Sequence, residues 1–535
     1  MEFDYVIIGS GFGGSVSALR LAEKGYRVAV IEQGNWVDSA RMEGASRDMK
    51  KLLWMPGVGL DGFFGQSVFR HLGIVKGVGV GGGSLVYAAV LLKPGDKFYQ
   101  DPLWSSLGVD WKRALAPFYD KASQMLGVTR NPGFDTMDHY LKKTAEKMGK
   151  GHTFGPTPMG ICFDRSKRKI RDPFFNGRGP ERNGCRMCGE CLTGCVHGAK
   201  NSLDKNYLYL AQGSGARILA QRKVTNIVPL ETGGYKISMR HPLRAFTRYP
   251  AILARNVILA SGVLGSLELL FRCREVTRSL PKISNQMGKI VRTNSEAIVG
   301  ALSPDPLLDL SHGTTVSSSF YPDPHTHITQ NRFPKGFSFN RWYFAPMVDH
   351  DRPWVRSWLT LGKILANPRA LFENWFAKNW HKRMTVLTVM QDLDNQVSFQ
   401  YRRSLTALFL KHRLMTVPVK GRQAPTNLKV ANRAAGILAK LTGSKPLNVI
   451  MESLGNLSFT AHILGGCHMG ASKDNGVIDT RHQVFGYPGL FVIDGSAISA
   501  NVGVNPSLTI LAMAERAMAL IPDKNKAACQ DTRMA

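Results

Sequence analysis

The first fourteen residues constrain the fold more than any other part of the chain. They read MEFDYVIIGSGFGG, so an apolar run at residues 4–8 leads directly into a glycine-rich turn. Apolar residues at helical spacing follow over residues 10–24, and a second apolar run, residues 26–31, ends at Glu32. A buried strand, a helix and another buried strand are typical of the opening of a parallel α/β sheet. We therefore expect a doubly wound, Rossmann-like nucleotide-binding domain.

The turn has the spacing of a dinucleotide-binding site. Gly9, Gly11 and Gly14 fit the pattern G-x-G-x-x-G, directly after a strand and at the start of a helix. Glycines there allow a tight turn and let the amides of the helix N-terminus approach a pyrophosphate. Glu32 is placed to accept hydrogen bonds from a ribose, and an acidic residue there disfavours a ribose 2′-phosphate. NAD and FAD share this pattern, so the cofactor stays open at this point.

A second glycine-rich loop, GVGVGGGS at residues 77–84, has too little side chain to build a core. It is expected to lay its backbone against a flat or anionic ligand, and the alternative is a tight crossing of two backbone segments. Further along, a strand at residues 257–260 precedes a helix at 264–271, and a strand at 489–493 precedes a helix at 506–520. These units indicate that one nucleotide-binding domain is built from separate stretches of the chain.

The length of 535 residues predicts more than one domain. Glycine thins, and aromatic and basic residues rise, over residues 304–454, where turns with proline interrupt short strand-like runs. We expect an α+β substrate-binding domain inserted into the nucleotide-binding one. The predicted nucleotide-binding parts are 1–110, 195–303 and 455–522, the substrate-domain parts are 111–194 and 304–454, and a polar tail covers 523–535.

Several segments, in order along the whole chain, resemble the glucose-methanol-choline (GMC) oxidoreductases, most of all their bacterial cholesterol oxidase branch. Besides the N-terminal turn, they are GVGVGGGSLVYAAV, VILASGVLGSLELL, GKIVRTNSE, HILGGCHMG and FVIDGSAISANVGVNPSLTILAMAER. The resemblance implies FAD rather than NAD. It implies oxidation of a hydrophobic alcohol, such as a sterol-like 3-hydroxyl, to the ketone by hydride transfer to the flavin. The electron acceptor would be O2 or a redox carrier.

The resemblance also implies a set of FAD contacts. The matching positions are Gly9, Gly11, Gly14, Glu32, Gly82, Gly83, Ser84, Val224, Asp494 and Gly495. The first four would hold the ADP half, and the next three would line the phosphate and ribityl path. Val224 would lie beside the adenine, and the last two would contact the pyrophosphate and the ribityl chain.

The catalytic pair implied by the resemblance is His462 and Asn505. A histidine suits this role because its pKa lies near neutrality, and an amide can orient a hydroxyl. Pro506 suits the first turn of a helix whose positive end would face the flavin. Two positions depart from the family pattern, with Ile463 where proline is usual and Tyr87 where an asparagine is frequent.

Other interpretations remain open from the residues. His468 is the rival catalytic histidine. A flavin enzyme of another class, a nicotinamide dehydrogenase, or a flavin-carrying membrane-binding protein without alcohol chemistry are alternatives to the alcohol oxidoreductase. An FAD-dependent dehydrogenase of another lipophilic alcohol, passing electrons through an iron–sulfur cluster to a carrier, is a further one.

Four cysteines crowd into one short segment as Cys185-x2-Cys188-x2-Cys191-x3-Cys195. This is the spacing of bacterial ferredoxins, although Val196 follows where proline is typical. The loop could hold a [4Fe–4S] cluster, zinc or no metal. A cluster near the flavin would favour a dehydrogenase that feeds a carrier over an oxidase.

The chain carries 69 Lys and Arg against 39 Asp and Glu, a formal net charge of +30. Five of its nine tryptophans gather in a basic region, namely Trp342, Trp354, Trp358, Trp375 and Trp380. A basic, tryptophan-rich and apolar region is typical of a surface that binds anionic membranes, and the alternative is a domain core with a solvated basic face. No nucleic-acid-binding motif accompanies the charge. With no signal peptide evident, we expect a cytoplasmic protein, peripheral at the inner membrane face if this surface binds lipid.

Overall fold

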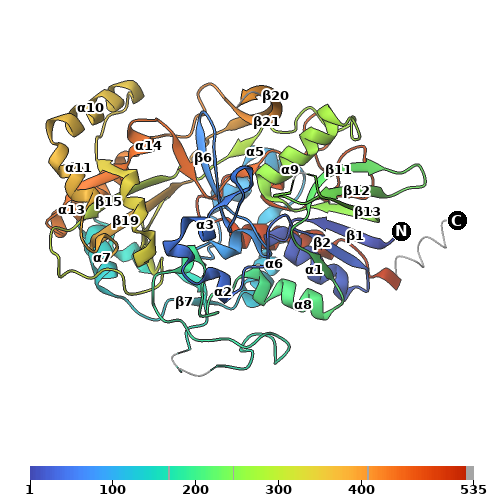
Figure 1. The fold of residues 1–535 in the computed structure, drawn as a ribbon, viewed down its shortest axis with the longest axis horizontal. Coiled ribbons are helices and arrows are strands. Elements are labelled where there is room, and N and C mark those ends of the chain that lie inside the picture. The colour runs from blue at the N-terminus through green and yellow to red at the C-terminus, as the bar shows by residue number, and fades with distance from the viewer. Residues whose placement is uncertain (165, 167–168, 245, 407–408, 526–535) are drawn as a thin grey trace.

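The structure is a computed structural model that describes residues 1–164, 166, 169–244, 246–406 and 409–525. Figure 1 shows two regions side by side, with the N-terminus in the region on the right. That region contains strands from the beginning, the middle and the end of the chain. The region on the left is built on strands that come mostly from residues 297–449. The expected α/β domain with an inserted α+β domain is confirmed.

The first sheet is the predicted Rossmann-like one. Among the described residues its strands are β1 (Phe3–Ile8), β2 (Val28–Ile31), β10 (Arg217–Leu219), β11 (Lys223–Pro229), β12 (Tyr235–Arg240), β13 (Arg248–Leu259) and β25 (Leu490–Val492). The order β10-β2-β1-β13 is parallel throughout, and β25 also pairs in parallel with the end of β13. β12 and β11 extend the sheet as antiparallel strands. The carboxyl ends of β1, β13 and β25 therefore meet at one edge, where parallel sheets bind ligands.

Five helices pack around this sheet in the first hydrophobic core. They are α1 (Phe12–Glu23), α6 (Trp111–Met125), α8 (Tyr207–Gly213), α9 (Gly262–Phe271) and α15 (Ser507–Ala519). α15 packs against both α1 and α6. Asp110 caps the start of α6, where its carboxylate accepts a hydrogen bond from the amide of Arg113 at 3.1 Å. The sequence places the boundary between the nucleotide-binding part and the substrate domain at residue 111, and this boundary stays a prediction. α6, which begins there, packs in the same hydrophobic core as the Rossmann-like sheet.

The second sheet is antiparallel and lies in the left-hand region of Figure 1. Its order is β18-β22-β15-β19-β17-β16-β8. The strands are β8 (Gly155–Pro156), β15 (Ala297–Leu302), β16 (Ser318–Asp323), β17 (Thr326–Asn331), β18 (Phe344–Pro346), β19 (Met384–Gln391) and β22 (Lys445–Val449). The helices α7 (Thr136–Lys147) and α13 (Lys429–Leu441) pack on it around a second core. Several of these strands are longer and more regular than the interrupted runs expected from the sequence.

Two small sheets join the regions. One has the order β21-β20-β14-β24, with β14 (Val291–Arg292), β20 (Val397–Thr406), β21 (Phe409–Pro418) and β24 (Leu464–Gly465). The other has the order β23-β6-β5, with β5 (Phe64–Val68), β6 (Leu72–Gly77) and β23 (Ser458–Thr460). His462 lies in the short link between β23 and β24. Pairing at both ends of this link fixes its position between the two regions.

The remaining elements are short or lie outside the sheets. The helices are α2 (Ser39–Met42), α3 (Met49–Leu52), α4 (Asp96–Gln100), α5 (Pro102–Ser105), α10 (Pro353–Ala366), α11 (Pro368–Trp375), α12 (Trp380–Arg383) and α14 (Ile450–Ser453). The strands are β3 (Trp54–Met55), β4 (Leu60–Asp61), β7 (Val128–Arg130) and β9 (Pro158–Gly160). Among the helices of the described ranges, none has both the length and the apolar character needed to span a bilayer.

Candidate active site

The glycine turn after β1 is closed against the carboxyl ends of β13 and β25. Gly9 has a φ of +102°, and a Cβ there would lie 2.4 Å from the carbonyl oxygen of Ala260. At Gly13 a Cβ would lie 1.7 Å from the carbonyl oxygen of Ile493, and at Gly14 it would lie 2.0 Å from the carbonyl oxygen of Gly9. Only glycine fits these contacts. The turn therefore brings the N-terminal, central and C-terminal segments together.

The second glycine loop lies directly against this turn. Gly82 has a φ of +52°, and a Cβ there would lie 2.8 Å from the Cα of Gly11. The hydroxyl of Ser84 donates to the carbonyl of Gly81 at 2.7 Å and accepts from the amide of Leu203 at 2.9 Å. The two glycine loops thus form one surface that is poor in side chains. Close backbone approach to a phosphate or a flat ring needs such a surface.

Glu32 is buried and hydrogen-bonded within the protein. Its carboxylate accepts from the hydroxyl of Ser10 at 2.8 Å, the amide of Ser10 at 3.1 Å and the amide of Gly34 at 2.9 Å. Burial raises its pKa, and these hydrogen bonds oppose that shift. Glu32 therefore braces the turn in this structure, and its contact with a ribose stays a prediction. Val224 is buried in β11.

Asp494 and Gly495 follow β25 and lie close to the glycine turn. The carboxylate of Asp494 accepts from the hydroxyl of Ser266 at 2.6 Å and from the amide of Ser496 at 2.8 Å. Burial raises the pKa of Asp494. Pro506 is the N-cap of α15 rather than its first residue. The predicted contacts of these residues with FAD stay predictions, while their placement around the glycine turn fits a dinucleotide.

His462 and Asn505 are brought together, as the resemblance implies. The Nδ2 of Asn505 donates to the Nε2 of His462 at 3.2 Å. On the other side of the ring, the Nδ1 of His462 donates to Oε1 of the buried Glu296. The second carboxylate oxygen of Glu296 accepts from the amide of Ala461 at 3.1 Å. Because Nδ1 donates to a carboxylate, Nε2 is the nitrogen left to accept a proton.

Unpaired polar atoms surround this pair. Among the described residues, neither ring nitrogen of the buried His327 has a hydrogen-bond partner, and the Oδ1 of Asn505 has none either. Burial lowers the pKa of His327 to about 3, and the neighbouring His462 acts in the same direction. Buried polar atoms are normally satisfied, so orphaned ones indicate a place for a ligand or water. His327 could not be predicted from the sequence, because a histidine inside a strand gives no motif.

The rival His468 has a different environment. Its Nε2 donates to the carbonyl of Asn475 at 3.1 Å, which ties two loop segments together. Burial lowers its pKa to about 4. Tyr87, which departs from the family pattern, donates its hydroxyl to the carbonyl of Asn201 at 2.7 Å. These contacts give His468 and Tyr87 structural roles, and His462 is the histidine that meets a carboxylate and Asn505.

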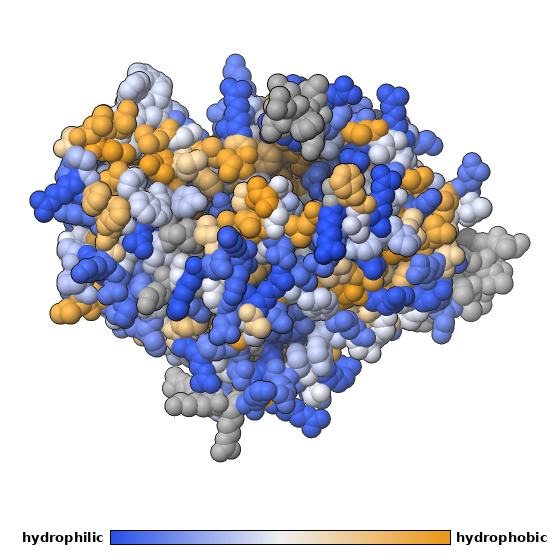
Figure 2. Space-filling model, in the orientation of Figure 1, coloured by the Kyte–Doolittle hydropathy of each residue, from blue (hydrophilic) through white to orange (hydrophobic). Residues whose placement is uncertain are grey.

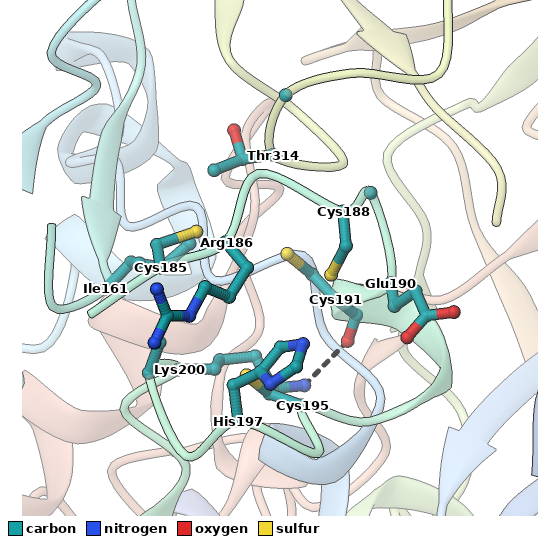
Figure 3. Close-up of a pocket in the computed structure, with 13 residues that line it drawn as sticks. Ile161, Cys185, Arg186, Cys188, Glu190, Cys191, Cys195, His197, Lys200 and Thr314 are labelled. Carbon is teal, nitrogen blue, oxygen red and sulfur yellow. Dashed lines mark hydrogen bonds between the residues drawn. The ribbon is translucent and has the colours of Figure 1, made fainter. Parts of the chain in front are cut away.

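The two remaining predicted features are the four-cysteine loop and the tryptophans. The four cysteines line one cavity, shown in Figure 3. Trp380 is buried in a local core, whereas Trp354 and Trp358 are exposed on α10. The tryptophan-rich region therefore divides between the two interpretations, with one part in a core and the other at the surface.

Comparison with known proteins identifies the class. A family model described as "FAD binding domain" matches residues 4–43, and models described as "GMC oxidoreductase" match residues 179–273 and 412–514. The chain therefore combines an FAD-binding domain with the GMC oxidoreductase domains, and the fit of the two glycine loops to a dinucleotide agrees with this.

Relatives and a solved structure extend this result over the chain. A "Cholesterol oxidase" of Acinetobacter baumannii is 38% identical over 534 residues, which cover 98% of this chain and 95% of that protein. A "Cholesterol oxidase" of Mycobacterium tuberculosis (strain ATCC 25618 / H37Rv) is 40% identical over 545 residues, which cover 98% of this chain and 92% of that protein. The solved structure of pyridoxine 4-oxidase from Mesorbium loti has a TM-score of 0.62 at 16% identity. The match covers 96% of this chain and 98% of that one, and it supports the fold. The chain belongs to the GMC oxidoreductase family and is an FAD-dependent oxidoreductase that acts on CH–OH groups.

Proposed function

We propose that this chain oxidises the 3-hydroxyl of a sterol-like alcohol to the ketone. The observation that carries the proposal is the triad in which Glu296 holds His462 and His462 contacts Asn505. Its near-full-length similarity to two cholesterol oxidases supports a sterol as the substrate class. FAD, when bound, supplies the hydride acceptor.

His462, Glu296 and Asn505 have different roles in the oxidation of the hydroxyl. Nε2 of His462 accepts the hydroxyl proton once the hydroxyl replaces the Asn505 amide at that nitrogen, since its Nδ1 already donates to Glu296. The carboxylate of Glu296 stabilises the imidazolium that results, as a negative charge beside a positive one. The Nδ2 of Asn505 can then donate to the hydroxyl oxygen and orient it, while the single hydroxyl hydrogen points to Nε2 of His462.

Anaerobic mixing of the FAD-loaded enzyme with alcohols tests this proposal. We expect a 3-hydroxysterol to bleach the visible flavin band and yield the ketone, while the matching sterol methyl ether does not. Asn505→Leu should slow flavin reduction far more than it weakens FAD binding. Equal losses in the two measurements would contradict the role of Asn505. Faster bleaching by long-chain primary alcohols than by any sterol would contradict the substrate class.

O2 is the proposed electron acceptor, because relatives of this chain carry the name oxidase. A redox carrier is the alternative acceptor, and a cluster in the four-cysteine loop would pass electrons to it. The family models describe FAD alone, so a [4Fe–4S] cluster as second cofactor rests on that loop. Stoichiometric hydrogen peroxide during turnover supports O2. Turnover that proceeds only with an added one-electron dye would overturn it.

We also propose that the outer face of α10 and α11 binds an anionic membrane surface. Trp354, Trp358 and Leu365 are 64%, 69% and 71% exposed. Apolar surface gathers over these helices at the upper left of Figure 2. Residues 352–383 hold seven Lys and Arg, of which Arg352, Lys363, Arg369 and Lys378 are exposed. Exposed aromatic side chains beside basic ones favour the headgroup region of a bilayer, where a sterol would be found.

The inner side of α10 is tied to the segment that leads to His462. Arg356 is buried, and its guanidinium donates to the carbonyl of Glu452 at 3.1 Å and to the side chain of Asn456 at 2.9 Å. The hydroxyl of Ser357 donates to the carbonyl of Leu454 at 3.0 Å. A membrane-bound α10 would therefore hold the approach to His462 near the lipid.

Flotation with vesicles containing anionic lipid tests the membrane proposal. Trp358→Glu should reduce binding, whereas Tyr209→Glu, at an exposed tyrosine on α8 in the Rossmann-like region, should not. Binding should weaken at high salt, because the attraction of the basic residues is screened. Equal binding of the two variants, or no binding of the unmodified enzyme, would count against this surface. A cytoplasmic location, peripheral at the inner membrane face, stays a prediction.

A further inference from the structure

The four cysteines of the loop surround one space. Cys185, Cys188, Cys191 and Cys195 line one small cavity that is partly open to solvent. Figure 3 shows their side chains arranged around it, together with Lys200. All four are free thiols in this structure. Eleven residues of chain thus place four sulfur atoms around a cavity that the alcohol chemistry does not use.

The thiols do not meet at a single point. Within the described ranges, no group of three or more His, Cys, Asp and Glu side chains is placed to share one metal ion. A zinc site needs its four sulfur ligands around one atom. A polynuclear cluster instead needs its thiolates spread around a larger body, because each thiolate binds a different iron. The arrangement therefore speaks against a tetrahedral zinc site, and it leaves a cluster and a loop without metal.

The backbone of the loop packs tightly against neighbouring segments. A Cβ at Gly184 would lie 1.7 Å from the carbonyl oxygen of Asp164, and one at Gly194 would lie 2.8 Å from the side chain of Met42. Met187 has a positive φ of 53°, and its amide donates to the sulfur of Cys185 at 3.5 Å. Amide hydrogen bonds to sulfur are one of the means by which proteins tune iron–sulfur clusters.

Hydrogen bonds to residues 313–315 of the predicted substrate-binding domain also hold the loop. The amide of Gly189 donates to the carbonyl of Gly313 at 2.8 Å, and the amide of Gly313 donates to the carbonyl of Met187 at 2.8 Å. The hydroxyl of Thr315 donates to the carbonyl of Gly189 at 2.7 Å. The cavity wall therefore comes from two distant segments of the chain, which fix the loop before any metal binds.

A buried cation lies in the wall of the cavity. Lys200 is 1% exposed, and its ammonium group donates to the carbonyl of Cys191 at 2.7 Å, the dashed line in Figure 3. Arg186 also lines the cavity, and Glu190 is the carboxylate among the lining residues. A buried ammonium group with no carboxylate bonded to it is costly unless it faces negative charge. Four cysteine thiolates around a cluster supply that charge.

We propose that Cys185, Cys188, Cys191 and Cys195 bind a [4Fe–4S] cluster in this cavity. This goes beyond the proposed sterol oxidation and does not depend on the substrate. Zinc, a reduced loop without metal, and a cluster are the three outcomes that chemical analysis separates.

The same lysine connects the cavity with the flavin-binding surface. Its ammonium group also donates to the carbonyl of Leu85 at 2.8 Å and to that of Tyr87 at 3.2 Å, directly after the second glycine loop. A cluster there would lie next to the loop that the family uses for FAD. Oxidation of one alcohol releases two electrons and two protons. In the alternative route, in which a redox carrier replaces O2 as the acceptor, the cluster would take the electrons one at a time and pass each to a one-electron carrier protein or dye, while the protons go to solvent.

Iron and acid-labile sulfide measured on anaerobically purified holoenzyme test the site. We expect about four iron atoms and four sulfides per chain, and a low-temperature EPR signal after reduction. Cys191→Ser should lose the iron and the signal. Cys273→Ser, at a buried cysteine outside the loop, should keep both. FAD content and sterol bleaching, measured on the same preparations, separate a failure here from a failure of the proposed function.

Two results would overturn the cluster. One is a folded, FAD-loaded enzyme without iron that also takes up none when incubated anaerobically with ferrous iron and sulfide. The other is one tightly bound zinc per chain. Because these measurements use the unmodified chain, they decide the question even if a cysteine variant does not fold.

Discussion

Replacing Glu296 with Gln tests whether a carboxylate orients His462 for proton removal. In the structure one carboxylate oxygen accepts from Nδ1 of His462 and the other accepts from the amide of Ala461. Gln has a single acceptor oxygen, so the variant keeps at most one of these bonds, and it removes the negative charge. Nδ1 is then no longer held as the donor to an anion, and Nε2 becomes a weaker base.

The structure gives the expected size of the effect. A hydrogen bond to a charged group contributes about 1.5–3 kcal/mol, and about 1.4 kcal/mol corresponds to a factor of ten in rate. If this energy is lost only when His462 becomes positively charged, flavin reduction should slow roughly 10- to 150-fold. FAD binding should change little, because Glu296 makes its contacts on the histidine side of the site.

Anaerobic stopped-flow reduction of the flavin by a 3-hydroxysterol measures the effect. Glu452→Gln is the matched control. Burial holds the pKa of Glu452 well above its usual range, which favours the neutral carboxyl, and an amide is close to that form in charge and shape. The control should keep the rate within about twofold, which corresponds to a few tenths of a kcal/mol. An unchanged rate in Glu296→Gln, or an equal loss in both variants, would refute the role of Glu296.

Other variants test the frame of the site. Gly13→Ala should lower the free energy of unfolding by about 1–3 kcal/mol or more and impair FAD binding, because the added Cβ would lie 1.7 Å from the carbonyl oxygen of Ile493. Gly362→Ala is the control, since a Cβ there meets open space on α10, and it should not lower the free energy of unfolding. Burial lowers the pKa of His327 to about 3 and that of His468 to about 4, so the unfolded chain binds more protons below the ordinary value of 6.5. Stability should therefore be complete above that pH and fall as the pH drops through this window, by up to about 1.4 kcal/mol per pH unit per histidine. Denaturation between about pH 7.5 and about pH 5.5 measures this slope, and His327→Phe should reduce it; the same slope in the variant would count against the burial of His327.

The N-terminal unit could be predicted closely from the sequence. β1, α1 and β2 lie within about two residues of their expected bounds, because apolar periodicity and the glycines at 9, 11 and 14 are local signals. The proximity of His462 to Asn505 followed from the family resemblance. Their separation in the chain is 43 residues, so no local pattern brings them together.

Contacts between distant segments could not be predicted. Glu296 stands in the GKIVRTNSE segment, yet its bond to His462 crosses 166 residues and depends on how β15 and β23 are placed. His327 lies in an antiparallel sheet whose strand order the sequence does not reveal. Such pairings are set by tertiary packing rather than by local propensity, which explains why the carboxylate partner of His462 was missed.

The account rests on FAD held between the two glycine loops and the segment that carries Asp494. Titration of flavin-free, folded protein with FAD, followed by quenching of flavin fluorescence, tests this most directly. We expect saturation at one FAD per chain and a visible flavin spectrum in the purified complex. Folded protein that stays colourless and does not bind FAD would contradict the account.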